Sequence, residues 1–216
     1  MSQSAADTER NESRTSQASS GLAEGNVIVD LFEGFGVRSF SLTLLDEAGI
    51  KVAFKPHRPV CTLRLELPGL LLAAFQRRLS VIIRPLAAHA LSPVQLDDLT
   101  PSQLDRVRGF SFLVLETSPE NFQAWLAAQS ADAATIRRVK RAAGADLNAS
   151  GATRIAGSYN FKPKYAPGYH RVRLRSIAPQ RTVTIAELDA AGLIAQVEPL
   201  PCPPAMLPAI AREFDS

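Results

Sequence analysis

The sequence PVQLDDLTPSQL, residues 93–104, joins a predicted strand to a predicted helix. Its apolar part is expected to form a strand that ends in two adjacent acids, Asp97 and Asp98. Thr100 and Pro101 then supply a helix cap and the residue type preferred at the first helical position. Adjacent side chains on a strand point to opposite faces, so both carboxylates can reach one point only where the strand ends or bends.

Outward from this stretch, β-forming runs alternate with helix signals. Further strands are expected at residues 37–46, 50–54, 80–85, 110–117 and 170–177. Helices are expected at residues 27–36, 63–79 with a kink or division at Pro68-Gly69, 118–125, 131–143 and 184–192. Because these elements interleave without strict βαβ spacing, the sequence predicts a two-layer α+β domain with a mixed β-sheet flanked by helices.

Length and composition indicate one folded domain of 216 residues, 46% hydrophobic and 21% charged. Residues 1–24 are expected to form a disordered leader, residues 25–195 the folded domain and residues 196–216 a Pro-rich tail. The longest apolar run, near residues 67–75, is shorter than the ~20 residues that a bilayer requires. Because a secretory signal is also missing, the sequence predicts a cytoplasmic protein without membrane contact.

Charge is distributed unevenly. Of the 24 Lys and Arg residues, eleven lie between Arg137 and Arg181, whereas only one of the 21 acids, Asp146, lies there. A net charge of +3 therefore combines a strongly basic segment with an acidic remainder. Such a segment favours a polyanionic partner, because neutralising phosphates releases counterions.

The acids admit two interpretations. Asp97 and Asp98 could end a strand as a polar turn, and Asp146 could be a turn residue after the helix stop at Gly144. Alternatively, carboxylates at strand ends bind the hard cations of phosphoryl-transfer sites, and Asp146 would complete a Mg²⁺ or Mn²⁺ site beside a triphosphate or a nucleic acid.

The segment ATRIAGSYNFKPKY, residues 152–165, mixes cations and aromatic rings. Rings on which bases stack, set among cations that follow the backbone, are typical of single-strand binding. A surface loop with its rings in the core is the alternative. Three arginines follow at alternating positions of the strand over 170–177 and are expected to share one face: Arg171, Arg173 and Arg175. Thr117 and Ser118 are expected to begin a helix and are secondary candidates for binding phosphate.

Six motifs in order resemble the RepB-type primases of plasmids, members of the archaeo-eukaryotic primase superfamily. They are IRP (83–85), LDDL (96–99), ETSPENFQAWL (116–126), GAD (144–146), RIAG (154–157) and N-x-K-x-K-Y (160–165). The resemblance covers roughly residues 25–177. It implies a primase-like catalytic domain, a metal-dependent nucleotidyltransferase that builds primers from nucleoside triphosphates on single-stranded DNA in plasmid or mobile-element replication.

The resemblance also implies roles for individual residues. Asp97, Asp98 and Asp146 would be the catalytic, metal-binding acids for Mg²⁺ or Mn²⁺. Nucleotide and template binding would fall to Arg154, Asn160, Lys162, Lys164, Tyr165, Arg171 and Arg173. A replicative helicase or a replication initiator is the protein partner that such a function calls for.

Two departures from the family keep other functions open. The family's His before the Arg of the RIAG stretch is replaced here by Gly151-Ala152-Thr153, and only about forty residues follow the last matched strand. The first departure favours an alternative, a non-catalytic single-stranded DNA-binding replication module with a degenerate primase fold. A metal-dependent nuclease would use the same acids to degrade the strand.

Overall fold

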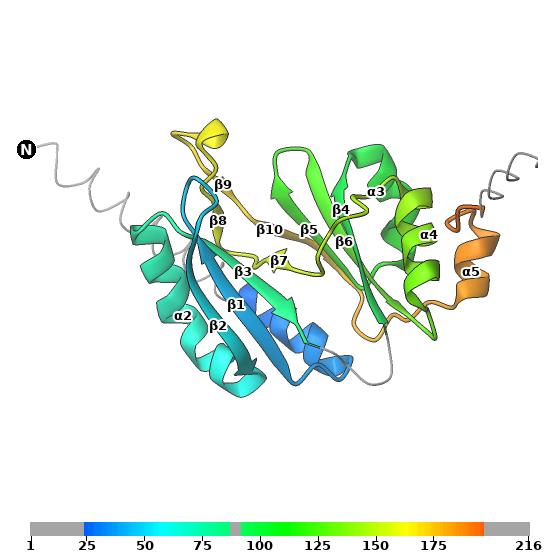
Figure 1. Ribbon diagram of the computed structural model, residues 1–216, viewed down its shortest axis with the longest axis horizontal. Helices are drawn as coiled ribbons and strands as arrows, with labels where there is room; N and C mark the ends of the chain where they lie inside the picture. The colour runs from blue at the N-terminus through cyan, green and yellow to red at the C-terminus, as the bar shows by residue number, and fades with distance from the viewer. Residues whose placement is uncertain (1–23, 87–91, 197–216) are drawn as a thin grey trace, which may run out of the picture.

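The computed structural model describes residues 24–86 and 92–196 and arranges them in two four-stranded sheets and a short hairpin (Figure 1). Nearly all of the expected leader and tail lies outside the described residues. Within the described ranges, every ladder between named strands is antiparallel, and one isolated bridge, Ala128 with Val183, is parallel. The α+β class is confirmed, although the strands form separate sheets where the sequence suggested one mixed sheet.

The first sheet contains the N-terminal hairpin and has the strand order β2-β1-β3-β7. Its strands are β1 (Ser39–Leu45), β2 (Lys51–Pro59), β3 (Ser80–Pro85) and β7 (Thr153–Arg154). The predicted turn between β1 and β2 is present: the Ile50 amide donates to Asp46 Oδ1 at 2.8 Å. Gly49 has a φ of 80° there, a conformation that glycine adopts without strain.

Two helices pack on the first sheet, residues 24–34 and α2 (Val60–Gln76). Their apolar side chains, Phe32 and Leu67 among them, share a core with Phe40 of β1 and Ile83 of β3. The helix predicted at residues 63–79 is therefore confirmed with earlier bounds. Pro68 lies inside α2 and does not divide it.

The second sheet has the strand order β10-β5-β6-β4 and is buried on both faces. Its strands are β4 (Ser92–Leu99), β5 (Leu113–Ser118), β6 (Asn121–Ala128) and β10 (Arg173–Ile177). Successive side chains of β6 enter different cores, because side chains alternate along a strand. Trp125 packs with Phe32 in the first core, whereas Leu126 packs in a second core.

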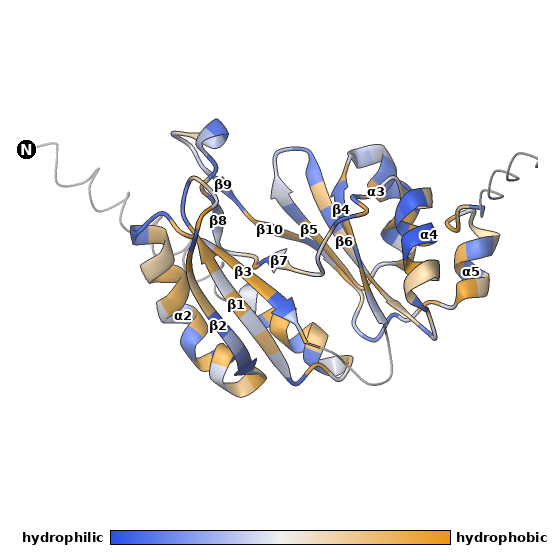
Figure 2. Cartoon of the chain, viewed as in Figure 1, coloured by the Kyte–Doolittle hydropathy of each residue, from blue (hydrophilic) through white to orange (hydrophobic). Residues whose placement is uncertain are grey.

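The second core lies under three helices, α3 (Pro101–Val107), α4 (Ala133–Ala143) and α5 (Ile185–Ala190) (Figure 1). The predicted caps are confirmed: Thr100 and Thr184 each form a capping box, and Gly144 ends α4 with a φ of 71°. A short 3₁₀ turn, η1 (Arg108–Phe110), connects α3 to the segment before β5. Figure 2 shows α4 largely hydrophilic on its outer side, as its basic residues require.

The helix predicted from Ser118 to Trp125 is wrong, because the chain forms a hairpin there. Ser118 pairs with Asn121, and β5 and β6 run antiparallel on either side. Pro119 has a fixed φ and Glu120 has a φ of 57°, which together match a two-residue turn of type II. The Ser-Pro pair that resembles a helix cap is thus the start of a tight turn.

The strand predicted at residues 170–177 is interrupted at Val172. Its first part, β9 (His170–Arg171), pairs with β8 (Tyr159–Asn160), whereas β10 joins the second sheet. Val172 lies between them, and its amide donates to the Ser158 carbonyl at 2.8 Å. The three arginines of this segment therefore lie on two different strands, Arg171 on β9 and Arg173 and Arg175 on β10.

Within the described ranges, no helix has both the length and the apolar character that a membrane span requires.

Candidate functional site

The two adjacent acids lie on a β-bulge of β4. Leu96 pairs with Ala124 and Leu99 pairs with Phe122, so three steps along β4 face two steps along β6. The extra residue bends the strand, and Asp98 takes a left-handed φ of 58°. Both Asp97 and Asp98 consequently line the same cleft, as a strand that bends permits.

This cleft has a volume of about 270 Å³ and is lined by residues of β3 to β8, of the loop before β7 and of the segment after β8. It gathers seven of the ten predicted site residues: Asp97, Asp98, Arg154, Asn160, Lys162, Lys164 and Tyr165. The others lining it are Ile82, Thr117, Ser118, Asn121, Gln123, Ser150 and Ala152. Two carboxylates thus share one polar cleft with an arginine and two lysines.

Arg154 and Asp97 interact electrostatically across the cleft. Burial raises the pKa of the Asp97 carboxyl, while a hydrogen bond from Gln123 and the charge of Arg154 oppose that rise. Burial likewise lowers the pKa of Arg154, and the negative charge of Asp97 opposes this change. Within the described part of the chain, the buried Nε of Arg154 has no hydrogen-bond partner. A polar atom left in this way is available to a ligand.

Amide side chains hold the acids in place. The Trp125 indole N–H donates to Gln123 Oε1 at 3.0 Å, so the amide nitrogen of Gln123 is left to donate to Asp97. Asn121 Nδ2 donates to Asp98 Oδ1 at 3.1 Å. Sequence reasoning missed Gln123 and Asn121, because it placed both residues in a helix instead of a strand.

Gln95 connects β4 to the loop that precedes β7. Its side chain is 2% exposed, donates to the Ala152 carbonyl at 2.5 Å and accepts from the Gly151 amide at 2.6 Å. These two hydrogen bonds fix the backbone just before Arg154. Gln95 was also missed, and it acts on the cleft only through this loop.

Asp146 lies beside the pair but has different contacts. Its amide donates to the Asp97 carbonyl at 3.0 Å, so the two backbones touch. Its carboxylate accepts the Asn148 amide at 2.8 Å, as in an Asx turn, and it is not among the residues that line the cleft. Lys140, which is 8% exposed, lies near enough for the charges of Asp97 and Asp146 to oppose the lowering of its pKa by burial.

The segment from Asn160 to Tyr165 forms the opposite wall of the cleft. Asn160 Nδ2 donates to the Thr117 carbonyl at 3.0 Å, while its buried Oδ1 has no partner among the described residues. Tyr165 follows in η2 (Pro163–Tyr165). Burial would raise the pKa of its hydroxyl, but a hydrogen bond with Ser118 and the charges of two lysines lower it on balance.

The other two rings of the 152–165 segment do not line the cleft. Phe161 is 2% exposed, and Tyr159 stacks on it at a centroid distance of 5.7 Å. Arg171 and Arg173 are also not among the lining residues. Arg171 is half-buried and forms an ion pair with Glu24 at 3.6 Å, whereas Arg173 is exposed on β10.

Within residues 24–86 and 92–196, no group of three or more His, Cys, Asp or Glu side chains is placed so that it could hold a metal ion. The acids gathered in the cleft are therefore the pair Asp97 and Asp98.

The fold and the cleft together define an α+β domain in which two acids and several cations line one polar cleft. The model of the RepB DNA-primase N-terminal domain matches residues 68–190, more than half of the chain, and the chain belongs to this family. The resemblance seen in the sequence is thereby confirmed.

Solved structures agree with this assignment. The catalytic domain of the primase RepB′, in complex with initiator DNA, is 26% identical to this chain, with a TM-score of 0.60. The superposition covers 78% of this chain and 94% of the RepB′ chain. A second structure of primase RepB′ is 26% identical, with a TM-score of 0.61, and the superposition covers 78% of this chain and 62% of that RepB′ chain. The expected primase-like fold is confirmed by these structures.

Among curated proteins, Mobilization protein A of Escherichia coli is 34% identical over 97 residues, which is 44% of this chain. The chain spans only 12% of the length of that relative.

Proposed function

We propose that this domain is a DNA primase that joins nucleoside triphosphates into short primers on a single-stranded DNA template. One observation carries the proposal: a bulge in β4 brings Asp97 and Asp98 into a cleft whose other wall holds Arg154 and the segment with Lys162 and Lys164. Acids facing cations match a substrate that is itself a metal-bound triphosphate. Membership of the RepB primase family supports the same reaction class.

The donor set fits a divalent cation. Mg²⁺ and Mn²⁺ prefer carboxylate oxygens, and Mg²⁺ is commonly bound by one or two protein carboxylates together with substrate phosphates. Asp97 and Asp98 would hold such an ion, and when bound it would supply Lewis-acid stabilisation of the phosphoryl group. The resemblance also assigns Asp146 to the metal, but its described contacts place it in a turn, and the proposal does not require it.

The remaining cleft residues bind and orient the substrate. Arg154 offers a buried, unpartnered Nε–H to a phosphate oxygen, and Lys162 and Lys164 are exposed on the opposite wall to pair with the triphosphate or the template. Asn160 presents an unpartnered Oδ1, which can accept a hydrogen bond from a base or a sugar. Arg173, exposed on β10, would contact the template backbone outside the cleft.

We extend the proposal to the whole protein as follows. Residues 25–195 form the primase unit, and the reaction serves plasmid or mobile-element replication together with a helicase or a replication initiator. The family match and the likeness to RepB′, solved with initiator DNA, support this assignment.

One observation favours a second candidate, a non-catalytic single-strand binder with a primase fold. The described residues gather two acids in the cleft and no group of three that could hold a metal ion. Such a binder would bind single strands in a salt-dependent manner but would neither incorporate nucleotides nor gain thermal stability from metal and triphosphate.

Incorporation of labelled nucleoside triphosphates on circular single-stranded DNA with Mg²⁺ or Mn²⁺ distinguishes these functions. A primase gives short labelled products that the double substitution Asp97→Ala/Asp98→Ala abolishes, while Asp105→Ala on the exposed face of α3 does not. Binding without products supports the binder, and shortening of an end-labelled template supports a nuclease.

A further inference from the structure

Four aromatic rings form a cluster beside α2, separate from the residues that line the cleft. Phe75 lies 4.9 Å from Tyr159 between ring centroids, Tyr159 stacks on Phe161, and Phe161 meets Tyr169 edge-on at 5.0 Å. Two of these rings come from the 152–165 segment that the sequence singled out for base stacking. They are not used by the cleft.

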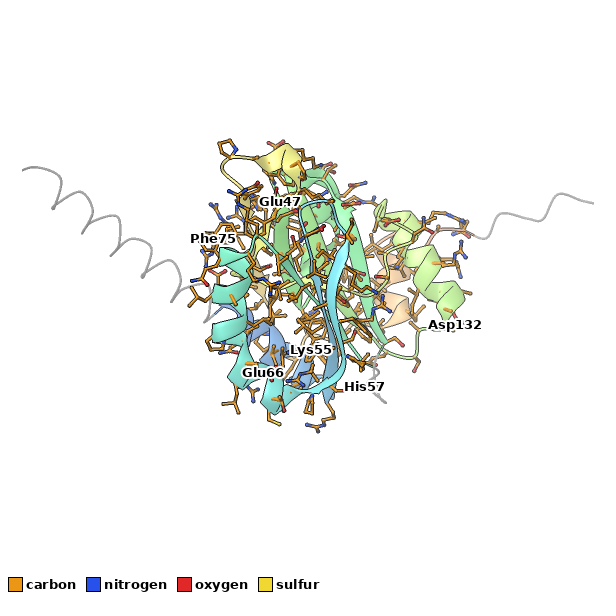
Figure 3. All side chains as sticks on the ribbon, turned by 60° about the vertical axis from the view of Figure 1, so that its left-hand side comes forward. Glu47, Lys55, His57, Glu66, Phe75 and Asp132 are labelled. Carbon is orange, nitrogen blue, oxygen red and sulfur yellow. The ribbon has the colours of Figure 1, made fainter. Side chains whose placement is uncertain are left out.

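The outer part of this cluster is open to solvent. Phe75 is 51% exposed, and Tyr159 is partly exposed, whereas Phe161 beneath them is 2% exposed. Figure 3 shows Phe75 on the outer side of α2, near the C-terminal end of the helix. A buried ring thus supports a pair of rings whose faces or edges remain available to a flat partner.

Cations lie near the four-ring cluster. Arg77 and Arg78 are exposed directly after α2, and the Arg78 guanidinium lies 5.8 Å from the centre of the Tyr169 ring. Lys162, adjacent to Phe161 in the chain, is also exposed. The charge of Arg78 is partly balanced by Glu47, with which it pairs at 3.2 Å. Exposed rings among cations favour unpaired bases and phosphates over an apolar protein surface.

The hairpin of β8 and β9 connects the cluster to the cleft. Tyr159 and Asn160 are neighbours on β8, so their side chains point to opposite faces. Asn160 reaches Thr117 at the cleft, and Tyr159 reaches Phe75 on the other side. A single strand of nucleic acid that leaves the cleft past Lys162 can therefore cross the β8–β9 hairpin and reach the rings of Phe75 and Tyr159.

We propose that Phe75 and Tyr159 form an accessory binding site for single-stranded nucleic acid, on which an unpaired base of the template stacks outside the cleft. The assignment of the strand as template rests on the proposed function. The stacking site itself does not, because it requires neither metal nor the cleft acids.

Fluorescence anisotropy with labelled oligothymidylates of about 4 to 16 nucleotides tests the site in a chelating buffer. The expected result is that Phe75→Ala weakens binding of the longer oligonucleotides about five- to a hundredfold, as for the loss of one stacked base, and leaves the shortest unaffected. Phe75→Trp should retain the affinity. Leu65→Ala is the matched control, because Leu65 is 82% exposed on α2 and lies ten residues, about 15 Å, along the helix.

An abasic nucleotide moved along the longest oligonucleotide sharpens the test. At one position of the oligonucleotide, the abasic nucleotide should weaken binding to the wild type. The same substitution should not affect binding to Phe75→Ala, because that variant already lacks the ring on which the base stacks. The proposal is overturned if Phe75→Ala binds every length as the wild type does, if Leu65→Ala loses as much, or if the wild type binds none. If Phe75→Ala weakens binding as expected but the wild type incorporates no nucleotides, the primase function is contradicted and the stacking site is not.

Discussion

The bulge of β4 and the loop over residues 144–152 approach the cleft from neighbouring positions, yet only the bulge places its acids inside it. Their backbones are joined by the hydrogen bond from Asp146 to Asp97 at 3.0 Å. On the bulge, Asp97 and Asp98 face the cleft, whereas the Asp146 carboxylate turns back to its own loop. A backbone hydrogen bond between Asp146 and Asp97 therefore does not bring their carboxylates together in the cleft.

The difference lies in what holds each carboxylate. Gln123 and Asn121 donate to the acids of the bulge from the neighbouring strand β6, so these hydrogen bonds fix the acids relative to the sheet. The Asp146 carboxylate is held by Asn148 of its own loop, and Gln95 fixes that loop further along. A rigid sheet orients a ligand set better than a loop does.

The largest expected effect comes from removing the acids of the bulge. Asp97→Ala/Asp98→Ala should lower nucleotide incorporation by roughly 10²–10³-fold or more, because the groups that stabilise the reacting phosphate are lost. Binding of single-stranded DNA in a chelating buffer should not weaken, since two negative charges leave the cleft. Equal incorporation by the double variant and by the control Asp105→Ala would place the chemistry elsewhere.

The next largest effect is expected from removing the hydrogen bonds by which Gln95 joins β4 to the loop over residues 144–152. Gln95→Ala leaves the Gly151 amide and the Ala152 carbonyl without their partner and should lower the free energy of unfolding by about 1–3 kcal/mol. Chemical denaturation measures it. Gln129→Ala is the control, because that exposed side chain bonds only Thr182 among its described partners and should cost about 0.5 kcal/mol or less. Equal losses would show that Gln95 does not anchor the loop.

Much of the fold could be predicted because local signals agree with the tertiary structure. The strand that carries Asp97 and Asp98 and the caps at Thr100 and Thr184 follow from side-chain chemistry within a few residues, although β4 continues past the two acids to Leu99. Strand β6 could not be predicted, because both of its faces are buried and its alternation is invisible in the sequence NFQAWLAA. Its Ala, Gln and Leu favour a helix locally, and packing between two cores overrides that preference.

For the candidate site, residue types could be predicted but orientations could not. Adjacent acids can reach one point only where a strand ends or bends, and the bulge of β4 is such a bend. The positions of Tyr159 and Asp146 depend on a hairpin and a turn made of short segments, whose side-chain directions no periodicity encodes. Gln95 and Asn121 act through partners that are distant in the chain.

A smaller effect is expected at the start of the loop. Gly144 has a φ of 71°, and a Cβ there would lie 2.3 Å from Gln103 Nε2. Gly144→Ala should therefore cost about 1–2 kcal/mol in unfolding free energy, the cost of a left-handed conformation for alanine. Gly168→Ala, where a Cβ meets nothing within 4 Å, is the matched control. Thermal denaturation of both variants checks this, and equal melting temperatures would contradict the strain.

The smallest effect is expected for Asp146 itself. Asp146→Asn keeps an oxygen that can accept the Asn148 amide, so stability should change by about 0.5 kcal/mol or less. Incorporation should fall by less than about tenfold, because the position lies outside the cleft lining. A loss as large as that of Asp97→Asn in the same assay would instead establish Asp146 as a third metal ligand.

The most direct test of the central claim is anomalous diffraction from crystals soaked with Mn²⁺ and a non-hydrolysable nucleoside triphosphate. We expect a manganese peak in the cleft, within about 2.0–2.6 Å of carboxylate oxygens from both Asp97 and Asp98, with the triphosphate beside Arg154. The same map shows whether Asp146 coordinates the ion. A cleft without manganese, or manganese bound only at other acids, would contradict the assignment.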